Sequence, residues 1–195
     1  MLTIIRQKDN RVVRAFTHKL ADIPNGVNVS TAEFVQRVLK EGTPVGKDAT
    51  TGLYHPVKVA ILTAAAGNTD TAYTVAKGHD FKVGDFIMLK PAGKAYAITA
   101  IATNATDATS DDITVGTTLG AAAAIGDGIY QAAAQAATNV SAFKYQPIGL
   151  VGESYDIEPD SNLLVNVVTI GQVREALIPA LGAEVKAKLP LIKFI

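Results

Sequence analysis

The side chains that could do chemistry are few, and they are widely spaced along the 195 residues. No two of the three histidines have the i, i+4 spacing of metal ligands on one helix face. These histidines are His18, His55 and His79. A group of aspartates offers oxygen ligands for calcium, but no Asp-x-Asp-x-Asp-Gly loop followed by Glu is present. The group is Asp107, Asp111 and Asp112. We predict surface or turn histidines, a solvated acidic loop and no metal site.

Candidate nucleophiles and phosphate-binding groups have simpler structural interpretations. Asp85 and Asp127 each follow a glycine before an apolar segment, where an aspartate accepts hydrogen bonds from the N–H groups of a turn. Ser30 does not lie in a Gly-x-Ser-x-Gly sequence. Gly46-Lys47 is followed by an acidic residue, so a hairpin turn is favoured over a phosphate loop. The sequence therefore predicts no catalytic residue, no cofactor and a protein that is not an enzyme.

The composition excludes several kinds of partner. Eighteen basic and 18 acidic residues give a formal net charge of zero, so nothing attracts nucleic acid or an anionic membrane. Hydrophobic residues make up 48% of the chain, as in a folded protein with a core of its own. The absence of cysteine rules out disulfides and sulfur-bound zinc. No signal-peptide pattern and no apolar run of about 18 residues is present, so we expect synthesis in a cytoplasm.

The clearest helix pattern begins at Ser30. Its hydroxyl could cap the first turn while Glu33 reaches back to the cap, and an apolar stripe follows at spacings of three and four residues. The stripe contains Phe34, Val35, Val38 and Leu39. Gly42 suits the left-handed residue that often ends a helix. The spacing predicts a helix of about three turns before Gly42.

Most of the chain has the period-two pattern of β-strands. Residues 43–62 predict a strand, a polar hairpin tip at 47–52 and a second strand. Residues 64–138 are rich in Ala, Thr, Gly and Asp, and they predict four or more short strands. Two alanine runs there, 121–124 and 132–137, have helical propensity that nearby glycines oppose in the first run. After residue 139 the earlier pattern returns, with a strand predicted at 163–170.

We therefore predict a mainly β fold with one or two short helices. Residues 1–63 and 139–195 share a pattern that the middle lacks, so they are expected to form one β domain. Residues 64–138 are expected to be inserted in it as a small antiparallel β barrel or sandwich.

The two ends of the chain carry separate predictions. Residues 1–29 predict an extended arm with at most one short strand, Val12 to Phe16, and a turn at Ile23-Pro-Asn-Gly26. The tail predicts a short helix that ends before Pro190, and then an apolar strand that either completes the sheet or joins a neighbouring subunit. Arg174 and Glu175 either form an intersubunit pair or face solvent.

Several segments resemble the head decoration and head-fibre proteins of tailed bacteriophages. They are Gly42-Thr-Pro-Val-Gly-Lys, Gly52-Leu-Tyr-His-Pro-Val, Pro147-Ile-Gly-Leu and Val165-Asn-Val-Val-Thr-Ile-Gly-Gln-Val-Arg-Glu. In that family a Gly-Thr-x-Leu/Val-Gly turn begins the core and a Gly-x-Val strand closes it. The resemblance implies a noncatalytic virion protein on the outer capsid surface, with the major capsid protein as its partner. It also implies a homo-oligomer, commonly a trimer, made in a bacterial host.

A second hypothesis is a carbohydrate-binding or adhesin-like module carried by residues 64–138. Aromatic rings in and beside that segment could stack on sugars, although no Trp is present and packing in a strand core explains them better. The rings belong to Tyr73, Phe81, Phe86, Tyr96 and Tyr130.

Overall fold

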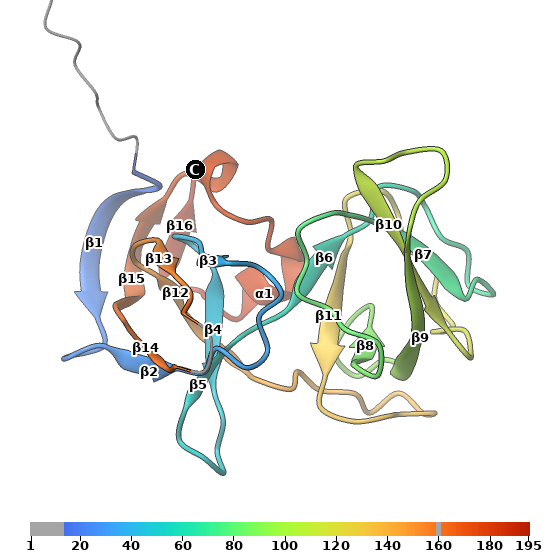
Figure 1. Ribbon diagram of the computed structural model, residues 1–195, viewed down its shortest axis with the longest axis horizontal. Helices are drawn as coiled ribbons and strands as arrows, with labels where there is room; N and C mark the ends of the chain where they lie inside the picture. The colour runs from blue at the N-terminus through green and yellow to red at the C-terminus, as the bar shows by residue number, and fades with distance from the viewer. Residues whose placement is uncertain (1–13, 159–160) are drawn as a thin grey trace, which may run out of the picture.

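Two sheets account for most of the molecule, and Figure 1 shows them side by side along its long axis. The computed structural model describes residues 14–158 and 161–195. The blue and red ends of the chain share one sheet, and the green and yellow middle forms the other (Figure 1). The predicted mainly β fold is confirmed, and one α-helix and one 3-10 helix are present in the described residues.

The first sheet, which we name the terminal sheet, has eight strands. In spatial order they are β1 (Phe16–Asp22), β15 (Val167–Val173), β12 (Pro147–Val151), β4 (Pro44–Lys47), β5 (Tyr54–Pro56), β2 (Val27–Val29) and β14 (Leu163–Val165), with β16 (Ile192–Phe194) beside β15. A separate pair contains β3 (Val38–Leu39) and β13 (Tyr155–Asp156). The hairpin predicted within residues 43–62 is confirmed, because β4 and β5 pair antiparallel. Its second strand does not continue unbroken to Leu62, since it ends at Pro56 and the chain then enters the other sheet as β6 (Val59–Ile61).

The second sheet, which we name the curled sheet, has six antiparallel strands. Their order is β6 (Val59–Ile61), β11 (Gly128–Ala132), β8 (Phe86–Met88), β9 (Tyr96–Thr103), β10 (Ser110–Val115) and β7 (Ala72–Ala76). The outer strands β6 and β7 meet at a bridge between Leu62 and Val75. Next to it, the N–H of Thr63 donates to the carbonyl of Thr74 at 2.9 Å. The sheet therefore bends back on itself around a core, as a small barrel does.

Three hydrophobic cores hold these elements. One lies inside the curled sheet and includes Tyr73, Ile98 and Ile113. Another lies at the β2 and β14 end of the terminal sheet. The largest is shared between the sheets, since it combines Leu150 and Val168 of the terminal sheet with residues of β8 and β11. The division into one domain of residues 1–63 and 139–195 and an inserted module of residues 64–138 stays a prediction, because the pairing of strands does not show which part folds independently.

The predicted helix between Ser30 and Gly42 is wrong. The segment instead contains a turn and the short strand β3. Tertiary contacts override the local pattern: Leu39 is fully buried, whereas Val35 is 55% exposed, so the stripe does not act as one face. Ser30 donates its N–H to the carbonyl of Tyr54 at 2.8 Å, and its predicted capping partner Glu33 bonds elsewhere.

The alanine runs are not helical either. Ala123 exchanges two hydrogen bonds of 2.9 Å with Ala66, and Ala136 does the same with Ala95. These extended contacts satisfy backbone groups that a helix would have used. At each of these two bridges both residues are alanines, so two chain segments approach closely where the side chains are small.

The ends of the chain differ from prediction in one respect. The described part of the expected arm contains two strands, β1 and β2, and not one at most; residues Val12 and Val13 lie outside the described residues. The turn at Ile23–Gly26 is confirmed by the hydrogen bond from the Gly26 N–H to the Ile23 carbonyl. The helix before Pro190 is confirmed as α1 (Gly182–Ala187), which Figure 1 places between the sheets.

The apolar C-terminal strand completes the sheet of its own chain. β16 pairs parallel with β15 through Ile192, which is 4% exposed. The 3-10 helix (Glu175–Leu177) precedes α1, and Glu175 forms an ion pair with Lys186 of the same chain. Arg174 and Glu175 are exposed.

Candidate functional site

The three histidines lie in three different places. His18 is exposed on β1. His79 places Nε2 at 3.5 Å from an Asp111 carboxylate oxygen, and its Nδ1 accepts the Phe81 N–H. Burial lowers the pKa of His79, against the opposing effect of Asp111. His55 is 8% exposed and stacks on the Tyr145 ring, with centroids 4.2 Å apart.

The predicted solvated acidic loop is only partly correct, because Asp111 and Asp112 belong to strand β10 and are partly buried. Asp107 accepts hydrogen bonds from the hydroxyls of Thr109 and Ser110, which lower its pKa to about 2. Asp112 is held by Thr74 and Asn104. Each carboxylate thus has a separate structural partner. In residues 14–158 and 161–195, no group of three or more His, Cys, Asp or Glu is arranged to hold a metal ion.

Two turns of the curled sheet repeat the same hydrogen-bonding pattern. The Asp85 carboxylate accepts the Lys82 N–H at 2.9 Å, and Asp127 accepts the Ala124 N–H at 2.8 Å. In both turns the glycine before the aspartate has a φ above +90°. The predicted structural role of these aspartates is confirmed. Asp85 has a further role, because its side chain also enters a polar cluster between the sheets.

This polar cluster, which we name the junction cluster, brings together Glu33, Lys58, Asp85 and Gln131. Lys58 lies between β5 and β6, and its side chain is 1% exposed. Its Nζ lies 2.8 Å from Asp85 Oδ2 and 3.9 Å from Glu33 Oε2. Gln131 of β11 donates from Nε2 to Asp85 Oδ1 at 3.0 Å. The cluster therefore joins a loop of the terminal sheet to two strands of the curled sheet.

Glu33 is the second acidic centre of the junction cluster. Its Oε1 accepts the Lys144 ammonium at 2.6 Å and the Tyr145 hydroxyl at 2.9 Å. Burial raises the pKa of Glu33, but these donors outweigh it and the pKa is lowered overall. Burial and the adjacent Glu33 raise the pKa of Tyr145. Glu33 Oε2 is buried and accepts no hydrogen bond from any described residue.

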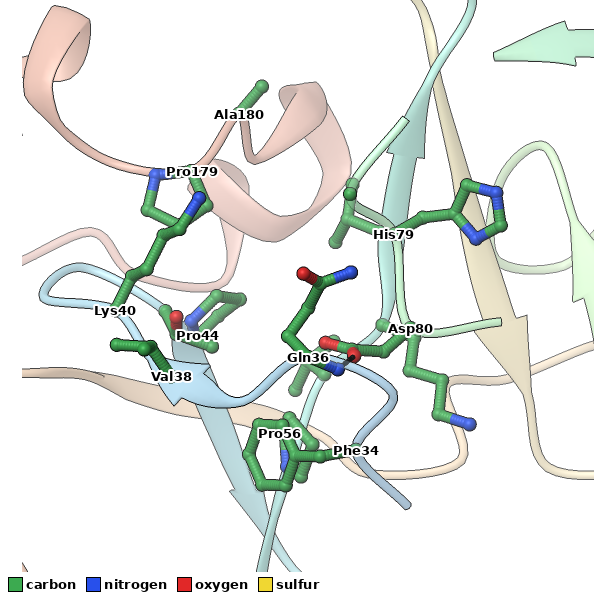
Figure 2. A pocket seen from close by; sticks show the side chains of 15 residues that line it. Phe34, Gln36, Val38, Lys40, Pro44, Pro56, His79, Asp80, Pro179 and Ala180 are labelled. Atoms are coloured by element: carbon green, nitrogen blue, oxygen red, sulfur yellow. Dashed lines mark hydrogen bonds between the residues drawn. The ribbon is translucent and has the colours of Figure 1, made fainter. Parts of the chain in front are cut away.

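A cleft lies beside the junction cluster, between the two sheets. Figure 2 shows Gln36 extending into it and the His79 ring turned away from it. Asp80 accepts the backbone N–H groups of Val35 and Gln36 at 2.8 and 3.1 Å, which ties one wall to the other. The cavity volume is about 80 Å³. That space suits water and is well below the roughly 300–1,000 Å³ of typical small-molecule sites.

The aromatic rings considered for sugar stacking are core residues. Tyr73, Phe81 and Tyr130 are at most 3% exposed. Phe86 and Tyr96 are partly buried and pack against the cores. None of these five rings forms an open stacking platform, so packing explains them.

The outer edges of the terminal sheet are open among the described strands. β1 pairs only with β15, and β14 pairs only with β2. Each edge carries an exposed leucine, Leu20 at 76% and Leu164 at 65%. An edge strand of this kind offers unpaired N–H and C=O groups to another chain. These edges are the clearest candidate interaction surfaces of the described protein.

Sequence reasoning missed the junction cluster. In the predicted second strand Val57, Val59 and Ile61 alternate with Lys58 and Ala60, a pattern that places Lys58 on the polar side. In the structure Lys58 is buried. The one signal was a charged residue within the apolar run Val57–Leu62, two residues from a proline. Its partners lie 25 or more positions away along the chain, so spacing alone could not bring them together.

Acidification is expected to destabilise the fold through His55. Burial lowers the pKa of His55 from 6.5, with Glu33 and Asp48 opposing, so the unfolded chain binds a proton that the folded chain does not. The free energy of unfolding should therefore fall as the pH drops below the unfolded value and level off below the folded one. His55→Phe keeps the stacked ring and should flatten this profile between about pH 7 and pH 5 in urea titrations. A variant with the wild-type slope would contradict the assignment; His79 titrates in the same direction and accounts for a remaining slope.

Comparisons with protein-family models, curated proteins and solved structures find no match for this chain. Within the described residues, no helix has the length and apolar character needed to cross a membrane. The functional argument therefore depends on the geometry of the chain itself.

Proposed function

We propose that this chain is a noncatalytic structural protein of a tailed-phage virion, which binds the outer capsid surface as a head decoration or head-fibre protein. The observation that carries the proposal is the terminal sheet. It unites strands from both ends of the described chain and, among the described strands, leaves the seven-residue strand β1 open along one edge. The segments that resemble decoration proteins contribute β4, β5, β12 and β15 of this same sheet.

The edge of β1 suits the addition of a strand from the major capsid protein. Main-chain hydrogen bonds along an added strand supply affinity without a deep pocket. Leu20 adds apolar area beside that edge. The curled sheet lies at the opposite end of the long axis (Figure 1), so a molecule bound through β1 would project it outward.

We also propose that the protein acts as a homo-oligomer, with a trimer favoured. Three exposed apolar side chains near the C-terminus provide contact area for another copy. They are Leu177, Leu191 and Ile195, at 46%, 62% and 51% exposure. The zero net charge removes long-range repulsion between copies.

Capsid binding tests this function directly. The purified chain is mixed with capsids from a phage or prophage that encodes it but has had its gene deleted, and co-sedimentation is measured. We expect saturable binding, with a copy number that distinguishes trimers from monomers. Leu20→Asp should weaken binding about tenfold or more, because a buried leucine contributes roughly 1.5–3 kcal/mol.

Leu164→Asp is the matched control, since it places the same charge on the opposite edge strand β14. It should bind like the wild type. No sedimentation of the wild-type chain with capsids would overturn the proposal. Binding to a glycan array without binding to capsids would favour the carbohydrate-binding alternative, whose candidate rings are buried or partly buried.

A further inference from the structure

The junction cluster contains an amine and a carboxyl group in direct contact, shielded from water. Lys58 Nζ lies 2.8 Å from Asp85 Oδ2, and the lysine side chain is 1% exposed. A second carboxylate, Glu33, points its Oε2 at the same nitrogen from 3.9 Å. An ordinary ion pair needs one carboxylate; this lysine has two, with different surroundings.

The backbone holds both reacting groups in place. Lys58 directly precedes β6 and Asp85 directly precedes β8, and β11 pairs with both strands. Gln131 of β11 donates its N–H to the Lys58 carbonyl and its Nε2 to Asp85 Oδ1. The N–H of Lys82 fixes Asp85 Oδ2. Such positioning at two strands that flank β11 replaces a bimolecular encounter by a contact of fixed geometry.

We propose that Lys58 and Asp85 condense into an intramolecular amide bond, with Glu33 as the proton carrier. The bond would link the starts of β6 and β8 across β11. It would give a chain without cysteine a covalent cross-link. This inference does not depend on the capsid-binding function.

The reaction balances without any further reagent. A proton passes from the Lys58 ammonium to the Asp85 carboxylate, which gives a neutral amine beside a carboxylic acid. The amine lone pair then attacks Asp85 Cγ and forms the C–N bond. Glu33 takes a proton from that nitrogen and delivers it to the hydroxyl group on Cγ, whose C–O bond breaks. One water molecule leaves, and Glu33 returns to its starting state.

Two further details suit these roles. Glu33 Oε1 is engaged by Lys144 and Tyr145, whereas Oε2 is buried and accepts no hydrogen bond within the described chain, so it is free to receive a proton. Gln131 is 3% exposed and donates to Asp85 Oδ1, the oxygen on which charge develops during attack. A fixed donor at that position stabilises the tetrahedral intermediate.

Intact-mass spectrometry of the denatured full chain tests the proposal. The wild type should weigh less than its sequence by one water molecule, about 18 Da. Tandem spectra of a digest should contain one branched peptide that joins the segments around Lys58 and Asp85. A wild-type chain of full sequence mass with a free Lys58 would overturn the proposal.

Three variants separate this bond from other causes of water loss. Lys58→Arg keeps the positive charge but has no nucleophilic amine, so it should have full mass. Glu33→Gln should also have full mass, because the proton carrier is lost. Asp85→Asn can form the same bond by losing ammonia, about 17 Da below the mass of that variant.

The Asp127-Gly128 step supplies the matched control, since such a step can lose water by forming a succinimide. Asp127→Ser removes the carboxyl group that would form the succinimide, and it should leave the Lys58 cross-link intact. Water loss that maps to residues 127–128, or that persists in Lys58→Arg, would overturn the proposal. If a variant fails to fold, the wild-type mass and branched peptide still decide the question.

Discussion

Replacing Tyr130 with alanine is expected to lower the free energy of unfolding by about 3–5 kcal/mol. Tyr130 is 1% exposed and lies in the core shared by the two sheets. Its ring meets Phe143 edge-on, with centroids 5.5 Å apart. Its hydroxyl accepts the Glu184 N–H of α1 at 3.2 Å. Truncation would open a cavity where the curled sheet, α1 and the returning chain meet.

Urea unfolding followed by circular dichroism measures this loss. Tyr130→Phe is the matched control, because it keeps the ring and removes only the hydroxyl. It should cost about 1 kcal/mol, the usual size of one hydrogen bond. A loss below about 1 kcal/mol in the alanine variant would show that the shared core contributes little to stability.

Replacing Gly42 with alanine is expected to cost about 2–5 kcal/mol, from backbone strain together with overpacking. Gly42 has a φ of +85°. An added Cβ would lie 2.2 Å from Ile178 Cγ2 and 2.5 Å from Ile178 Cβ. Because Ile178 packs against the shared core, it cannot move away freely. The effect is measured by the same unfolding experiment.

Gly52→Ala separates the two causes. Gly52 has a similar φ of +74° but no atom within 4 Å of its added Cβ, so that variant should show strain alone, about 1–2 kcal/mol. The Ile178→Ala substitution should lower the free energy of unfolding by less in the Gly42→Ala variant than it does in the wild type. Equal losses in the Gly42 and Gly52 variants would contradict the predicted collision.

The sequence predicted the strands better than it predicted the segment between Ser30 and Gly42, which has the pattern of a helix but does not form one. Alternating side chains around Val57 and Ile61 indicate a strand because one face must be buried. The pattern after Ser30 has the spacing of a helix, yet Glu33 binds Lys144 and Tyr145. Asp80 accepts two backbone N–H groups that the helix would have paired internally. Those partners lie 44 or more residues away along the chain, so the local pattern of side chains contains no information about them.

The candidate site was less predictable than the fold. The turn roles of Asp85 and Asp127 follow from the Gly-Asp sequence, because the contacts are local. The junction cluster depends on how the two sheets meet, and Lys58 is buried between them, away from the solvent-exposed faces. Burial of its charge is decided by tertiary structure. Only the structure brings Glu33, Lys58 and Asp85 together.

The chain passes from the terminal sheet to the curled sheet once, after β5, and returns to the terminal sheet once, at β12. Lys58 bonds to Gln131 through the backbone, and Lys144 donates its N–H to the Gln131 carbonyl. Tension applied to the curled sheet would therefore load two covalent tethers together. The hydrogen bonds that join both tethers to Gln131 of β11 would then bear load at the same time, whereas a single hanging strand is peeled away one bond at a time. This attachment suits a part that must stay joined while it is pulled.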